Sequence, residues 1–225
     1  MIDRNSDFFK YFNYCNCYWC QENDWPVLWK IDDSHETFYW FEIPKNASST
    51  IKDFYGKNSS ISFEHIRRNE TYHQLNDSIK PIVVYDDPID RFITLVNDYF
   101  SCGNWHNIYG RYILADLGLI DVHDKDLEKF SPHEKLKIIF SNIKNLTDRE
   151  QVHHFYPQKF FVDDLKFKDF ELVYKKNINE RFGINKSIWI NKSKKHILKE
   201  HLVPEQIKLL VDIYEEDYKF ISKFI

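Results

Sequence analysis

A lysine followed by small polar residues comes directly after an apolar, aromatic stretch of the chain. The run consists of Lys45, Asn46, Ala47, Ser48, Ser49 and Thr50. An ammonium group and several hydroxyl donors close together can hold an anion. If a helix begins at the end of the run, its free N–H groups and positive end add to that binding. The segment therefore predicts a phosphate-binding loop, and the alternative is a polar turn with serine as the helix cap.

This loop differs from the common phosphate loop of ATPases and GTPases. That motif reads G-x-x-x-x-G-K-[ST], and both of its glycines are missing here. An ordinary ATPase or GTPase is therefore not expected. A kinase is disfavoured as well, because no acidic set that would bind magnesium is evident.

Strand and helix patterns predict the elements that would position the loop. Strands are predicted over 37–43, 61–65, 81–85 and 171–174. Helices are predicted over 49–55, 69–79 and 88 to about 102, and from 132 and 204 onward. The recurring order of strand, loop and helix indicates an α/β fold with a P-loop-like parallel sheet flanked by helices. Ligands on such sheets bind beyond the carboxyl ends of the strands, where the 44–50 loop would lie.

Composition limits the class of protein. The chain has 225 residues, with 43% hydrophobic and 17% aromatic content, which is enough for one full domain. A net charge of −4 argues against nucleic acid as a partner. No apolar run has the length of a membrane span. We expect residues 1–36 to form an irregular, aromatic N-terminal segment packed on a domain that comprises 37–225.

Three of the four cysteines, Cys15, Cys17 and Cys20, lie close together. Thiolates at such spacing can bind zinc, and His35 could be a further ligand, but a second Cys-x-x-Cys pair is missing. We therefore expect small buried side chains rather than a metal site. The first residues show no basic segment followed by an apolar one, so we expect a cytoplasmic protein with reduced thiols.

The pattern Pro-Lys-x-x-Ser-Ser-Thr at 44–50 resembles the 5′-phosphosulfate loop of sulfotransferases that use 3′-phosphoadenylyl sulfate (PAPS). Its Ala-Ser-Ser-Thr form looks most like the carbohydrate-modifying branch of that family. The resemblance implies the sulfotransferase fold. It also implies that residues 45–50 hold the 5′-phosphate, and that Lys45 stabilises the charge that grows on this leaving group.

Residues 84–94 resemble the second nucleotide motif of the family, Arg-Asp-Pro-x-Glu-Arg-Phe-x-Ser. In that motif the first Arg and the Ser hold the 3′-phosphate. Thr94 keeps the hydroxyl at the Ser position, whereas Asp86 replaces the Arg and reverses its charge. A bound 3′-phosphate would therefore need a basic residue that offsets Asp86. The candidates are Arg67, Arg68, Lys192, Lys194 and Lys195.

Three further segments resemble the family in the same order. His65 lies about where the heparan sulfate 2-O-sulfotransferases carry a histidine base, so the resemblance implies a general base there; the alternative is an ordinary histidine at a strand end. Residues 153–158 and 191–195 resemble the His-Trp-x-Pro-Gln element and the Asn-Lys-Ser/Thr loop. The implied contacts are Arg67, His154 and Gln158 for the acceptor or substrate, and Lys192 and Ser193 for the nucleotide.

The expected function is transfer of a sulfuryl group from PAPS to a hydroxyl, most simply of a glycan. Such a transfer depends on positioning and charge stabilisation, and no metal is expected. Asp86 motivates the alternative. That alternative is a nucleotide-binding pseudo-enzyme of the same fold, or a transferase whose donor lacks the 3′-phosphate.

Overall fold

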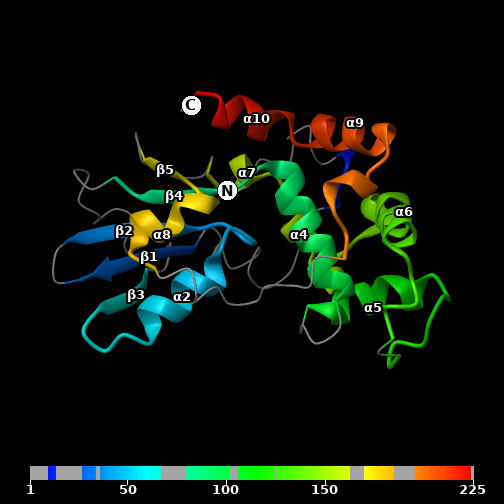
Figure 1. Cartoon of the computed structure of the whole chain (residues 1–225), viewed down its shortest axis with the longest axis horizontal. Helices are drawn as coiled ribbons and strands as arrows, with labels where there is room; N and C mark the ends of the chain where they lie inside the picture. Colours follow the sequence, from blue (N-terminus) through cyan, green and yellow to red (C-terminus); the bar gives the residue numbers. More distant parts are fainter. Residues whose placement is uncertain are drawn as a thin grey trace.

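A five-stranded mixed sheet carries helices on both faces, and several of the helices gather to one side of it (Figure 1). This computed structural model describes residues 10–13, 27–33, 36–66, 80–101, 106–124, 126–162, 170–184 and 196–223. The strand order is β3-β1-β2-β4-β5. The strands are β1 (Val27–Asp32), β2 (Thr37–Glu42), β3 (Ser62–Ile66), β4 (Ile82–Tyr85) and β5 (Glu171–Tyr174). The α/β class is as predicted.

The sheet is only partly parallel, which corrects the prediction of a parallel sheet. Strands β2, β4 and β5 pair in parallel, whereas β1 is antiparallel to both β2 and β3. Strand β1 lies within the segment 1–36 that we expected to be irregular. Its residues Leu28 and Ile31 are both fully buried, and they belong to the cores on opposite faces of the sheet. Because both faces are covered, β1 lacks the simple alternation that marks a half-exposed strand.

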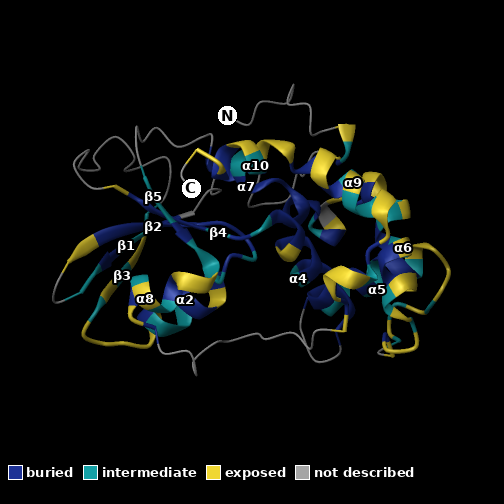
Figure 2. Ribbon diagram, turned by 45° about the horizontal axis from the view of Figure 1, so that its top comes forward, coloured by how far each residue is buried: buried dark blue, intermediate teal, exposed yellow. Residues whose placement is uncertain are grey.

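One face of the sheet packs on α2 (Ser48–Gly56) and α8 (Ile178–Phe182). The other face carries the larger core, in which the central helix is α4 (Pro88–Phe100). Adjacent residues of β2 separate accordingly: Trp40 lies in the first core and Phe41 in the second. Figure 2 shows how the buried residues gather on the sheet and on α4. Helix α4 therefore runs between the sheet and the helices beyond it.

The remaining helical elements cover the larger core and the carboxyl edge of the sheet. The α-helices are α5 (Asn107–Asp116), α6 (Pro132–Asn142), α7 (Gln158–Val162), α9 (Pro204–Ile213) and α10 (Glu215–Ile221). The 3-10 helices are η2 (Ile143–Asn145), η3 (Asp148–Glu150), η4 (Val152–Phe155), η5 (Lys175–Asn177) and η7 (Lys199–His201). Within the described ranges, none of the helices is both long enough and apolar enough to cross a membrane.

Local sequence signals predicted β2, β3, β4 and β5 and the helices α2, α4, α6 and α9–α10, but not β1, α5, α7, α8 or the 3-10 helices. The start of α4 is confirmed in detail, because the Asp87 carboxylate accepts the N–H groups of Ile89 and Asp90, each at 3.0 Å. The predicted terminal helix is divided at Tyr214, whose hydroxyl donates to the carbonyl of Phe155 at 2.9 Å. The predicted helix over 69–79, the cysteine cluster and His35 lie outside the described residues.

Candidate functional site

The loop between β2 and α2 has an unusual backbone. Lys45 and Ala47 both adopt positive φ angles, of 70° and 63°. The left-handed conformation costs an ordinary L-residue roughly 1–2 kcal/mol, and such residues gather at binding and catalytic sites. Two of them in three residues produce a tight turn at the carboxyl end of a parallel strand. Such turns form concave groups of backbone N–H donors that bind anions.

The carbonyl oxygens of this loop are occupied by protein donors. Ser48 Oγ donates to Ile43 O at 3.0 Å, and Arg91 Nε donates to Pro44 O at 3.0 Å. The ammonium group of Lys175 lies 3.1 Å from Lys45 O. The carbonyl of residue 47 accepts the N–H groups of residues 50 and 51 inside α2. Four backbone carbonyls of the loop are therefore occupied without a ligand, whereas the buried side-chain oxygen Oδ1 of Asn46 has no hydrogen-bond partner among the described residues.

Unlike these carbonyls, the backbone N–H groups at the start of α2 have no protein partner among the described residues. Among the described residues, no acceptor faces the backbone N–H of Ala47, Ser48 or Ser49. These donors lie at the N-terminal end of α2, which is the positive end of the helix dipole. A loop in which most backbone carbonyls are occupied and the backbone N–H groups are open is suited to an anion. The local geometry thus agrees with the predicted phosphate-binding loop.

The side chain of Lys45 is held inside the protein. Its Nζ atom lies 2.9 Å from Asp98 Oδ2 on α4, and the two side chains are only 9% and 8% exposed. Burial lowers the pKa of Lys45 below its usual value, although the Asp98 carboxylate opposes that shift. The sequence analysis did not identify Asp98. In this structure, the lysine expected to serve the leaving group already has a carboxylate partner.

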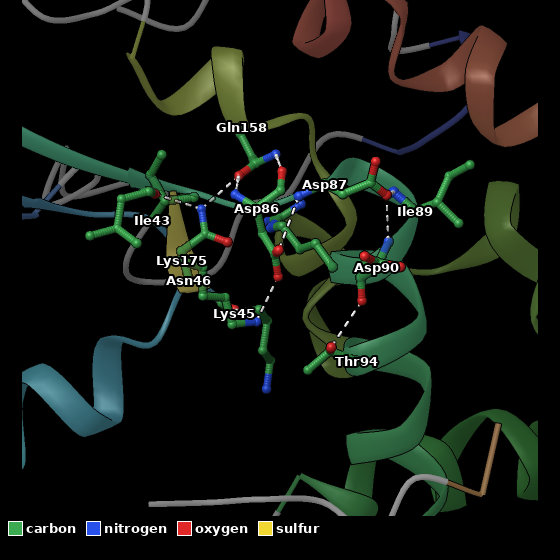
Figure 3. Close-up of polar contacts among 12 residues, drawn as sticks. Ile43, Lys45, Asn46, Asp86, Asp87, Ile89, Asp90, Thr94, Gln158 and Lys175 are labelled. Carbon is green, nitrogen blue, oxygen red and sulfur yellow. Dashed lines mark hydrogen bonds and ion pairs between the residues drawn. The ribbon is translucent and has the colours of Figure 1, made fainter. Parts of the chain in front are cut away.

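Asn46 and Gln158 join the loop to the end of β4 (Figure 3). Asn46 Nδ2 donates to Val84 O at 2.8 Å and to Gln158 Oε1 at 2.7 Å. The Gln158 amide also pairs with the backbone of Asp86, through bonds of 2.9 and 2.8 Å. Gln158 is 1% exposed, and both of its polar atoms are used by the protein. Its side chain therefore joins the loop to the end of β4, and the acceptor contact stays a prediction.

Arg91 holds two segments together at the centre of the site. Besides the bond to Pro44 O, its Nη1 atom donates to Tyr156 O at 2.9 Å and its Nη2 atom to His154 O at 3.0 Å. The side chain is 1% exposed. One guanidinium group thus fixes the start of the loop relative to the 154–156 segment. Arg91 stands in the second nucleotide motif, but its role could not be derived from the motif alone.

Asp86 has the basic partner that the sequence analysis required, but from an unexpected element. Lys175 Nζ lies 2.7 Å from Asp86 Oδ2. The candidates named from the sequence all lie outside the described residues, so this contact comes from a lysine that was not among them. Lys175 follows β5 directly, and β5 pairs with β4 so that Tyr85 is opposite Tyr174. That register places Asp86 and Lys175 side by side.

The predicted hydroxyl residues are placed differently from one another. Ser48 and Thr50 are buried, whereas Ser49 is exposed at the start of α2. Thr94 lies on α4, and its hydroxyl donates to Asp90 O at 2.9 Å (Figure 3). That bond directs the hydroxyl proton of Thr94 into its own helix. The predicted 3′-phosphate contact would require this hydroxyl to change partner.

His65 lies apart from the anion loop. It is exposed near the end of β3, and its ring centroid is 5.1 Å from that of Trp29. Strand β1 separates β3 from β2, so the two strands are about 10 Å apart at a spacing of ~4.8 Å per strand. Within the described residues, no hydrogen bond or ion pair joins His65 to the loop. The structure does not bring this predicted base and Lys45 together.

Two buried histidines lie nearer to Lys45. The rings of His106 and His154 are 5.8 Å apart, and His154 Nδ1 has no hydrogen-bond partner among the described residues. Burial and the charge of Lys45 lower the pKa of His106 to about 3. Burial, followed by nearby positive charges, also lowers the pKa of His154 well below its usual value. Both rings are therefore neutral at neutral pH.

The structure does not describe the remaining residues that were predicted to contact the nucleotide or the acceptor. Arg67, Lys192 and Ser193 lie outside the described residues, as do the other sequence candidates for the partner of Asp86. Within the described part of the chain, no group of three or more His, Cys, Asp or Glu residues is placed to hold a metal ion. The sequence analysis missed Asp98, His106 and Lys175, because each reaches the site through tertiary packing.

Comparisons with protein-family models, with curated proteins and with solved structures find no match to this chain. The class that the molecule itself defines is an α/β fold in which a five-stranded mixed sheet is flanked by helices. Its candidate site is the loop at the carboxyl end of β2.

Proposed function

We propose that the protein is a PAPS-dependent sulfotransferase that modifies a hydroxyl group, with a glycan as the acceptor class. One observation carries the proposal. In the loop after β2, the carbonyls of residues 43, 44, 45 and 47 are occupied, the N–H groups of residues 47–49 have no partner in the described part of the chain, and Lys45 adopts a left-handed conformation. This geometry suits a phosphate, and it occurs at the segment whose sequence resembles the 5′-phosphosulfate loop.

The proposed reaction is an in-line displacement at sulfur. The acceptor oxygen forms a bond to the sulfur atom while the bond between that sulfur and the 5′-phosphate oxygen breaks. The hydroxyl proton passes to a general base, and adenosine 3′,5′-bisphosphate leaves. Lys45 and the N–H groups of residues 47–49 would stabilise the charge on the leaving phosphate, and this step needs no metal ion.

A second candidate rests on Asp86 and Thr94. A carboxylate occupies the position at which the family has an arginine, and the Thr94 hydroxyl already donates to its own helix. These two features favour a nucleotide that lacks the 3′-phosphate. The second candidate is therefore a nucleotide-binding pseudo-enzyme, or a transferase with a donor of that kind.

Ligand-induced stabilisation separates the two candidates. We expect saturating adenosine 3′,5′-bisphosphate to raise the melting temperature by an amount equivalent to ~2–4 kcal/mol, and AMP or ATP to have a smaller effect. The comparison with AMP isolates the 3′-phosphate, since both ligands share the adenosine and the 5′-phosphate. A larger response to AMP than to the bisphosphate would favour the second candidate. No response to any of these nucleotides would remove the proposal altogether.

The general base is proposed to be His65, with His154 as the next candidate. We expect His65→Ala to keep nucleotide binding and to lose transfer by ~10²–10⁴-fold, as is usual for a general base. Release of the bisphosphate from PAPS, in the presence of polysaccharide acceptors, measures transfer. The exposed His123 provides the control, and His123→Ala should change neither quantity. Full activity of His65→Ala would assign the role elsewhere. His154 would be the next residue to replace, because its Nδ1 has no hydrogen-bond partner within the described ranges.

A further inference from the structure

Lys175 contacts both the anion loop and the residue that departs from the family motif. It is the first residue of η5, at the carboxyl end of β5. Its ammonium group lies 3.1 Å from Lys45 O and 2.7 Å from Asp86 Oδ2, and its side chain is 15% exposed. The sequence gives no local signal for this role, because Lys175 is one of several lysines in a polar segment.

The bond to Lys45 O holds one particular peptide group. The peptide between Lys45 and Asn46 is planar, so its carbonyl and its N–H point in opposite directions. Lys175 binds the carbonyl, and the N–H of Asn46 donates to Ile43 O at 3.2 Å. This peptide lies between the two residues with positive φ. Because it is held at both ends, the open N–H groups that follow it are fixed in direction.

The bond to Asp86 has an electrostatic effect. The Asp86 side chain is 10% exposed, and an unpaired carboxylate there would oppose a bound phosphate. Paired with Lys175, it adds little net charge to the site. Asp86 also accepts the N–H of Asp87 at 3.0 Å, so its carboxylate is fixed on the other side. Asp86 can therefore hold Lys175 in place without repelling the ligand.

We infer that Lys175 is a positioning residue of the anion site: it holds the Lys45 peptide in the anion-binding conformation, and Asp86 orients its ammonium group. This inference rests on the proposed function, because it assigns Asp86 and Lys175 to the phosphate site of that function. It explains the departure at Asp86. The carboxylate serves the loop through Lys175 and does not contact the ligand.

The test uses Lys175→Met, Asp86→Asn and the double variant in the full chain. Methionine keeps the length of the side chain without its charge, and asparagine keeps the oxygen that accepts the Asp87 N–H. Lys176→Met is the matched control. Lys176 is the exposed neighbour of Lys175, and its ammonium lies 4.5 Å from the Tyr174 ring. Three quantities are measured: the urea midpoint, amide hydrogen exchange of residues 45–50 without ligand, and the dissociation constant of adenosine 3′,5′-bisphosphate.

We expect Lys175→Met to lower the urea midpoint, because it leaves the Asp86 carboxylate buried without its ammonium partner. The double variant Lys175→Met/Asp86→Asn should restore the urea midpoint, because it removes the buried charge of Asp86 as well. It should still exchange the 45–50 amides faster than the wild type and bind the bisphosphate about fivefold more weakly, the loss expected for one hydrogen bond of ~1 kcal/mol. Lys176→Met should match the wild type in all three measurements.

Two results would overturn the inference. Wild-type exchange and affinity in the double variant would mean that Lys175 only neutralises Asp86. Unchanged exchange in Lys175→Met would mean that the bond to Lys45 O does not hold the loop. If the wild type binds no bisphosphate, the proposed function fails, and the amide exchange of residues 45–50 without ligand still decides the role of Lys175.

Discussion

Replacing Lys45 with methionine is expected to reduce sulfuryl transfer by at least ~10²–10³-fold and to remove most binding of adenosine 3′,5′-bisphosphate. That range is typical for the loss of one group that stabilises charge in a transition state. Lys45 is the cation of the loop, and it precedes the open N–H groups of α2. Without the ammonium group, the loop keeps its backbone donors but loses its full positive charge. Transfer is measured with PAPS and polysaccharide acceptors, and binding by titration.

The same substitution should also destabilise the protein. Lys45 and Asp98 form an ion pair whose side chains are 9% and 8% exposed. Removing one member of a buried pair leaves an uncompensated charge and costs about 3–5 kcal/mol. A loss of binding in Lys45→Met could therefore come from unfolding alone. The double variant Lys45→Met/Asp98→Asn separates the loss of stability from the loss of binding. It lacks the Lys45 ammonium group, and it also lacks the Asp98 carboxylate charge that the single variant leaves buried.

We expect the double variant to recover most of the stability and none of the binding. Lys57→Met is the matched control. Lys57 is a 75%-exposed lysine next to the end of α2, paired only with Asp53 among the described residues, and such surface pairs contribute about 0–1 kcal/mol. Near-normal affinity for the bisphosphate in the folded double variant would refute the assignment of Lys45 to the anion site.

The sequence predicted those parts of the site that depend on neighbouring residues, but not those that depend on contacts between distant segments of the chain. The loop after β2 and the cap at Asp87 are encoded within a few neighbouring residues, so they were predictable. Strand β1 was missed because both of its faces are buried. The pairing of Asp86 with Lys175 depends on the register between β4 and β5, and that of Lys45 with Asp98 depends on the position of α4. Neither is fixed by local pattern.

The resemblance to a family predicted which residue types are present, but it did not predict their positions and contacts. His65 occupies the expected place in the order of segments, yet β1 lies between its strand and β2. Gln158 matches a motif position assigned to the substrate, yet its amide is fully used by Asn46 and Asp86. A motif states which side chains are present. Only the packing shows which of their atoms remain available to a ligand.

Arg91→Met is expected to cause the largest loss of stability of any single substitution in the site. Arg91 is 1% exposed, and its donors bind three carbonyl oxygens, of Pro44, His154 and Tyr156, at 2.9–3.0 Å. Removing the guanidinium leaves these buried acceptors unpaired, and each unpaired group costs about 1–3 kcal/mol. We therefore expect a loss of at least ~3–5 kcal/mol, a large part of the 5–15 kcal/mol typical of a domain. The urea midpoint, at an unchanged slope, measures this loss.

Two further variants test whether the geometry of Arg91, rather than its charge, is responsible. Arg91→Lys keeps the charge, but an ammonium group cannot reach three carbonyls in the planar arrangement of a guanidinium, so we expect it to recover only part of the loss. Arg149 is the control, since it is 49% exposed, pairs with Asp116 at 2.8 Å and lies over the Tyr112 ring. Arg149→Met should cost no more than ~1 kcal/mol. If Arg91→Lys were as stable as the wild type, charge alone would explain the contribution of Arg91 to stability, and the three carbonyl contacts would not be what fixes the loop.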